Sequence, residues 1–199
     1  PPAPTTLPEA SMPSVSDVLT YTSDTLPSGQ SGAPLVQVTL NDGTPATFML
    51  DTGTSACAVT DAMVAKLGLK PEATKQAATP FIMDGTTAQS VKLTIKVGRF
   101  RFANFPTFVI KQSRFVEVLG HSLDGIIGMN LLSHFAIMLE PQHHVLVFEA
   151  PGKLSTKDIL ARGFDQVGSL PLTRAANGTY WTEVQMVNGL RTASENLMI

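Results

Sequence analysis

The feature that most constrains the fold is an apolar run that ends at a single carboxylate. Phe48-Met49-Leu50 leads into Asp51, and Thr52-Gly53-Thr54 follows at once. A charge placed directly after a buried segment is costly unless it is paired or has a function. We therefore expect a strand that delivers Asp51 to a loop whose own residues hold the carboxylate in place.

The segments around this loop follow the two-residue period of β-strands. Val36, Val38 and Leu40 alternate with polar residues, and Asn41-Asp42-Gly43 is a turn signal before the strand expected over residues 46–50. Many short strands with one or two short helices predict an all-β domain. Further alternating or apolar runs lie at residues 56–59, 91–97, 100–102, 105–110, 136–139 and 145–148.

Two segments have the signals of short helices. One is expected to be capped by Thr60 or Asp61 and to end at Gly68. The other follows Gly128 and is expected to extend as far as Phe135. Residues 111–122 are expected to form a loop.

Composition excludes several classes of protein. The chain has 199 residues, of which 43% are hydrophobic and 15% charged, so it can build the core of one domain or of one domain plus part of another. The net charge of −2 gives no electrostatic reason to bind nucleic acid. No apolar run reaches the ~20 residues that a membrane span needs.

The sequence offers no metal or disulfide site. Cys57 is the single cysteine, which excludes an intrachain disulfide, and we expect it to be a small buried residue. The spacing of His121, His134, His143 and His144 matches no metal site, so we expect solvated histidines.

The chain divides into four regions. Residues 1–24 are rich in Pro, Ser and Thr and are expected to be a flexible tail. Residues 25–150 hold the strand-rich domain, and residues 151–168 are a connector with one weak helix. Residues 169–199 are expected to begin a second, truncated copy of the domain.

A partial internal repeat supports this second copy. With Asn188-Gly189 aligned on Asp42-Gly43, the strand phase agrees, and Leu197-Met198-Ile199 falls on Phe48-Met49-Leu50. The residue equivalent to Asp51 would be the next one, beyond Ile199. Chance similarity between two hairpins is the alternative explanation.

The residues around Asp51 suit acid–base chemistry. Two carboxylates a few ångströms apart do not both ionise easily, so one serves as base while the other keeps its proton as acid. The Gly53 N–H can reach the Asp51 carboxylate, and the Thr54 hydroxyl can donate to its outer oxygen. The Thr52 hydroxyl can bond across to a partner loop. An ordinary turn aspartate is the structural alternative.

Asp51-Thr52-Gly53-Thr54-Ser55 resembles the active-site loop of the aspartic proteases, both pepsin-like and retropepsin-like. Ile126-Ile127-Gly128, followed by Asn130-Leu131-Leu132, resembles the segment that braces this loop in the same family. The resemblance covers roughly residues 30–150, about one lobe of such an enzyme. It implies a closed β-barrel lobe with Asp51 as a catalytic residue and Ile126, Ile127 and Gly128 behind its loop.

The resemblance also implies a flap, a hairpin that closes over the substrate. Met83, Asp84 and Gly85 occupy the matching place, although this stretch is poorer in glycine than the retroviral pattern. The family implies no metal and no cofactor.

The sequence thus predicts a lobe of an aspartic endopeptidase that acts on a peptide or protein substrate. Asp51 would need a second aspartate, supplied by a homodimer partner or by a second lobe, and the partial repeat favours a two-lobed parent. The alternative is a non-catalytic β-module of the same fold that binds peptides or assembles with partners. The sequence does not determine the cellular compartment, although an exported, periplasmic or secreted location is favoured.

Overall fold

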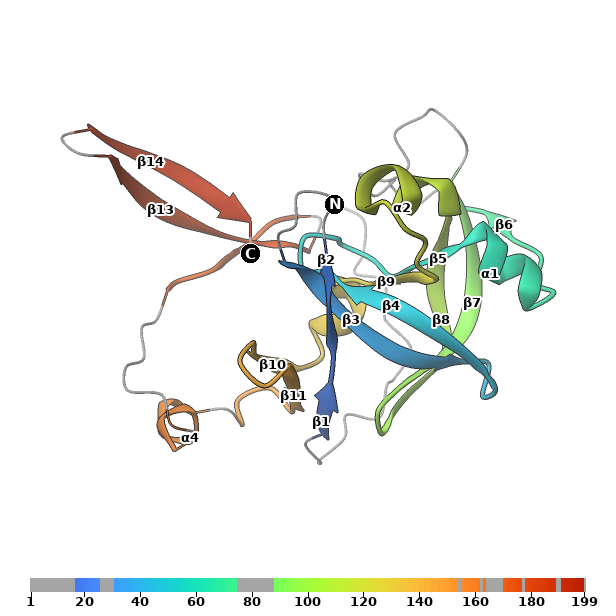
Figure 1. The fold of residues 1–199 in the computed structure, drawn as a ribbon, viewed down its shortest axis with the longest axis horizontal. Helices are drawn as coiled ribbons and strands as arrows, with labels where there is room; N and C mark the ends of the chain where they lie inside the picture. Colours follow the sequence, from blue (N-terminus) through green and yellow to red (C-terminus); the bar gives the residue numbers. More distant parts are fainter. Residues whose placement is uncertain are drawn as a thin grey trace.

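The alternating segments form strands that close into a barrel. The computed structural model describes residues 17–25, 31–74, 88–153, 155–161, 163, 170–176, 178–188 and 191–198. Six strands are neighbours in a ring, because β3 pairs with β4 on one side and with β7 on the other (Figure 1). The expected all-β closed barrel is confirmed. In ring order, the strands are β3 (Ser31–Leu40), β4 (Thr44–Leu50), β9 (Gly125–Ile127), β5 (Ala58–Thr60), β8 (Phe100–Ile110) and β7 (Gln89–Val97).

The short strand β9 is inserted between two strands that are much earlier in the sequence. It runs parallel to β4, with Leu50 opposite Ile127, and antiparallel to β5, with Ala58 opposite Ile126. The loop from β4 to β5 therefore has to pass over the end of β9. This placement brings Asp51, at the end of β4, next to the segment that follows β9.

Alternate residues of the barrel strands fill its interior. In β7, Val91, Leu93, Ile95 and Val97 are all buried, whereas the lysines between them are exposed. Apolar burial of this kind is the main favourable term in folding. The opposite faces of β4 and β9 form a second cluster, in which Met49 and Ile126 pack with α2 (Gln112–Leu119).

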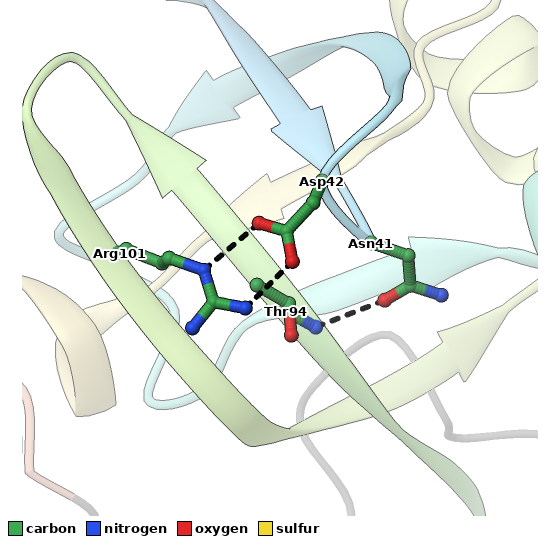
Figure 2. A network of polar contacts seen from close by, with 4 residues as sticks. All are labelled: Asn41, Asp42, Thr94 and Arg101. Carbon is green, nitrogen blue, oxygen red and sulfur yellow. Dashed lines mark hydrogen bonds and ion pairs between the residues drawn. The ribbon is translucent and has the colours of Figure 1, made fainter.

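A polar network fixes the turn between β3 and β4 to β7 and β8. Asn41 and Asp42 have positive φ angles of 47° and 60°, as a tight hairpin turn requires. The Thr94 N–H donates to Asn41 Oδ1 over 3.0 Å, and the Arg101 guanidinium donates to both oxygens of Asp42 over 2.8 and 2.6 Å (Figure 2). The turn signal read from residues 41–43 is confirmed.

The beginning of the described chain differs from the expectation. Residues 17–24 were expected to belong to a flexible tail, but the structure has β1 (Asp17–Thr20) and β2 (Thr22–Thr25) there. β1 pairs with β11 (Val145–Glu149), and β2 pairs with β3. The buried Asp17 side chain accepts a hydrogen bond from the Arg99 N–H over 2.7 Å. The partners of β1 and of Asp17 lie far away in the sequence, which is why local composition did not reveal this strand.

The helices also differ in part. The Thr60 hydroxyl caps α1 (Asp61–Lys66) by accepting from the Met63 N–H, which confirms the first helix. The second helix, α3 (Met129–Leu132), ends before Phe135. Residues 111–122 were expected to be a loop, but most of them form α2, with Phe115 and Leu119 buried one turn apart.

The remaining elements extend this framework. The hairpin expected after residue 136 is present as β10 (Ala136–Glu140) and β11, and β6 (Glu72–Ala73) pairs with β7. The connector holds α4 (Thr156–Leu160). The C-terminal part is a separate sheet that projects from the barrel (Figure 1), with β12 (Thr173–Arg174), β13 (Tyr180–Asn188) and β14 (Arg191–Met198). No helix in the described ranges has the length and apolarity to cross a membrane.

Candidate active site

The site is built on the Asp51 loop, which we define as residues 51–57, at the end of β4. The apolar side chains of Phe48 and Leu50 point into the barrel core, so the strand is anchored directly before the loop. The Asp51 N–H donates to the Ile127 carbonyl over 3.0 Å, which continues the β4–β9 ladder by one residue. The backbone of Asp51 is thus fixed by sheet pairing, while its side chain is half-buried.

Two neutral donors hold the Asp51 carboxylate. The Gly53 N–H donates to Oδ1 over 2.8 Å. The Thr54 hydroxyl donates to Oδ2, and this Thr54 side chain is buried. Both contacts match the roles expected from the sequence, and both orient the carboxylate without a cation. No described residue forms an ion pair with Asp51.

The loop rests on the bracing segment, which we define as residues 126–130. Ile126 and Ile127 are completely buried, on the two opposite faces of the sheet. Gly128 lies directly under the loop: a Cβ atom built there would be 2.5 Å from the Ala56 carbonyl oxygen and 2.8 Å from that of Thr54. Real Cβ contacts are not this close, so only glycine allows the two backbones to approach as they do.

Hydrogen bonds from the start of α3 hold the loop's carbonyl groups. The Met129 N–H donates to the Thr54 carbonyl over 2.8 Å, and the Asn130 N–H donates to that of Ser55 over 3.0 Å. These are N–H groups of a helix's first turn, which have no partner within the helix. The loop carbonyls therefore accept hydrogen bonds from the otherwise unpaired N–H groups of the helix, and these bonds hold the loop in place.

Asn130 contributes a side-chain contact that the sequence did not reveal. Its Oδ1 accepts from the Cys57 N–H over 2.8 Å, across 73 positions in the sequence. The only available signal was its place two residues after Gly128, within the motif already noted. That position indicates proximity to the loop but not which backbone group the side chain binds.

Cys57 is a buried structural residue, as expected. Burial raises the pKa of its thiol to about 12, so the thiol stays protonated near neutral pH. Its sulfur accepts from the Gly128 N–H over 3.4 Å. This contact is a further hydrogen bond between the loop and the bracing segment.

The remaining residues singled out in the sequence lie elsewhere. Met83, Asp84 and Gly85, the expected flap, fall outside the described residues. The Asp124 carboxylate accepts a hydrogen bond from the Thr47 N–H of β4 over 2.8 Å, at the end of β9 away from Asp51. The described residues contain no group of three or more acidic, histidine or cysteine side chains placed to bind a metal ion.

The matching family can now be set beside this geometry. Residues 36–131, which include both the Asp51 loop and the bracing segment, match the model of the family described as aspartyl protease. Over this stretch, the chain matches the aspartyl protease family. This match agrees with the resemblance that the two motifs indicated.

Two solved structures are similar to this chain. One is a retropepsin-like aspartic protease from Rickettsia conorii, at 21% identity over 67% of this chain and 89% of that one, with a TM-score of 0.46. The other is the retroviral protease-like domain of Ddi1 from Leishmania major, at 14% identity over 63% and 98%, with a TM-score of 0.40. No curated protein matches the chain.

Proposed function

We propose that the chain is the lobe of an aspartic endopeptidase in which Asp51 is one of two catalytic carboxylates. The observation that carries the proposal is the arrangement of the Asp51 carboxylate, held by the Gly53 N–H and the Thr54 hydroxyl above a bracing glycine. The match of residues 36–131 to the aspartyl protease family supports the same chemistry.

The chemistry follows from a pair of carboxylates that share one proton. The ionised carboxylate removes a proton from a water molecule, and the oxygen of that water attacks the peptide carbonyl carbon. The protonated carboxylate donates its proton to the carbonyl oxygen. The resulting diol collapses as the C–N bond breaks. The nitrogen takes the proton that the base removed from water, and a diol hydroxyl returns its proton to the other carboxylate. Activity therefore requires one carboxylate to be ionised while the other is protonated.

The second carboxylate comes from a second copy of the motif. In a homodimer it is Asp51 of the partner chain. In a two-lobed protein it belongs to a second lobe, which we propose begins near residue 169. The sheet formed by β12, β13 and β14 supports the two-lobed arrangement, since its strands pair in the same order as β2, β3 and β4.

Cleavage of an apolar peptide by the full-length protein tests this function. We expect cleavage at acid to neutral pH, blocked by a statine-type inhibitor that imitates the tetrahedral diol. Tight binding of the peptide without cleavage would instead identify a non-catalytic peptide-binding module. Cleavage that resists the statine but is stopped by a chelator would contradict the carboxylate mechanism.

The source of the second aspartate has its own test. In a homodimer, excess Asp51→Asn chain added to the wild type forms mixed dimers and lowers the activity. In a two-lobed protein, the same addition leaves the activity unchanged, and the specific activity does not depend on protein concentration.

A further inference from the structure

Asn130 bonds to the Asp51 loop through both its backbone and its side chain. Its N–H donates to the Ser55 carbonyl over 3.0 Å, and its Oδ1 accepts from the Cys57 N–H over 2.8 Å. One half-buried residue therefore forms hydrogen bonds with a carbonyl and an N–H that lie two positions apart in the loop. A neighbouring strand residue makes the same pair of contacts in a β-ladder, so Asn130 substitutes for a strand where regular pairing is interrupted.

This contact lies close to the carboxylate along the chain of hydrogen bonds. Thr54, whose hydroxyl donates to Asp51, directly precedes Ser55, and its carbonyl is held by the Met129 N–H over 2.8 Å. On the other side of Ser55, Cys57 begins the buried run into β5. A shift of residues 55–57 would therefore move Thr54 relative to Asp51.

We infer that Asn130 is a positioning residue for Asp51. It acts through the loop: its side-chain oxygen fixes Cys57, its N–H fixes Ser55, and the Thr54 hydroxyl is thereby held on the carboxylate. This inference rests on the proposed function for its catalytic consequence, while its structural consequence can be measured without activity.

Replacement of the side-chain oxygen is the test. Asn130→Ala removes the hydrogen-bond acceptor. Because alanine has a high helix propensity, the substitution does not destabilise the helical conformation of α3. Asn130→Asp keeps an acceptor in the same place, and an acidic residue in the first turn of a helix is favourable. Asn104→Asp, on the exposed part of β8, controls for the added charge.

The first readout is amide hydrogen exchange in the full chain. We expect Asn130→Ala to speed exchange at Cys57 and Gly53 by about tenfold or more, because local opening exposes their N–H groups. Exchange at Thr94, in β7, should not change. Asn130→Asp and Asn104→Asp should keep wild-type exchange at Gly53. If alanine prevents folding, Asn130→Ser serves as the shortened variant.

The second readout is kinetic. We expect Asn130→Ala to lower kcat roughly 10- to 100-fold with little change in KM, because a misplaced catalytic group affects the transition state more than substrate binding. Asn130→Asp should restore most of kcat. Unchanged exchange at Gly53 in the shortened variant, or an aspartate variant as impaired as alanine, would overturn the inference. If the wild type cleaves no peptide, the proposed function fails, and the exchange result alone decides the role of Asn130.

Discussion

The two ends of β4 each carry an aspartate, and their surroundings are opposite. Asp42, in the turn before the strand, is exposed and accepts two hydrogen bonds from the Arg101 guanidinium (Figure 2). Asp51, directly after the strand, is half-buried and accepts from a backbone N–H and a buried hydroxyl. The Arg101 side-chain hydrogen bond is the main cause that lowers the pKa of Asp42.

The difference separates a structural carboxylate from one that is available for chemistry. A permanent cation fixes the ionised form of Asp42 and occupies both of its oxygens. Neutral donors fix the position of Asp51, and none of the described residues forms an ion pair with it. A second carboxylate can then become its electrostatic partner, which the proposed mechanism needs. The following predictions test this contrast, from the largest effect to the smallest.

The largest effect is expected from a side chain added under the Asp51 loop. Gly128→Val places atoms against the carbonyl groups of Thr54 and Ala56, where the nearest would be 2.5 Å from a Cβ atom. The backbones would have to separate, so we expect a loss of about 3 kcal/mol in unfolding free energy and loss of activity. Denaturant unfolding with a parallel peptide assay measures both.

Gly43 provides the matched control at the other end of β4. A Cβ atom at Gly43 would have no heavy atom within 4 Å, and its φ angle is not in the left-handed region. Gly43→Val should therefore change the unfolding free energy by less than about 0.5 kcal/mol. Equal losses in the two variants would show that the close approach at Gly128 is not the cause.

An intermediate effect is expected from the hydroxyl that holds Asp51. Thr54→Val preserves the size of the side chain but removes the donor to Oδ2. Hydrogen bonds to charged groups contribute ~1.5–3 kcal/mol, so we expect kcat/KM to fall by about tenfold or more. Steady-state kinetics on a peptide substrate provides the measurement.

The comparison variant for this threonine is Thr47→Val. The Thr47 hydroxyl accepts an exposed hydrogen bond from Gln37 over 2.9 Å, so activity should stay within about twofold of the wild type. A Thr54 variant as active as this control would mean that the hydroxyl does not orient Asp51.

The smallest effect is expected at Asp42, and it depends on pH. Its pKa is lowered from 3.8 in the folded chain, so the pair with Arg101 stabilises the fold above that value, and the stabilisation is lost as the pH falls through the lower folded pKa. Asp42→Asn should therefore be slightly less stable than the wild type at neutral pH and equal to it in strong acid. Because both side chains are exposed, added salt should reduce the difference. Melting temperatures across this pH range, at low and high salt, decide the point.

The sequence predicted the parts of the site that depend on local chemistry. Asp51, Gly53 and Thr54 lie in a short run, and each has the contact expected from its functional groups. The buried glycine of the bracing segment could also be anticipated, because two apolar residues before Gly128 resemble a motif of known packing. In these cases the residue type itself limits what the position can do.

The features that were missed depend on distant partners or on a weak local signal. β1 is stabilised by pairing with β11, which lies more than 120 residues later. The side chain of Asn130 reaches Cys57 only because β9 inserts beside β5. In α2, two valines obscured the helical spacing of Phe115 and Leu119, although Gly120, with a φ angle of 80°, was an available stop signal.

Exchange of the Asp51 carboxyl for an amide tests the central claim most directly. We propose to measure kcat/KM of the full-length protein on an apolar peptide for the wild type, Asp51→Asn and Asp42→Asn. The account predicts that cleavage falls by at least about 1,000-fold in Asp51→Asn, since the dyad is lost, and stays within about twofold in Asp42→Asn. Undiminished cleavage in Asp51→Asn, with both variants folded, would contradict the account.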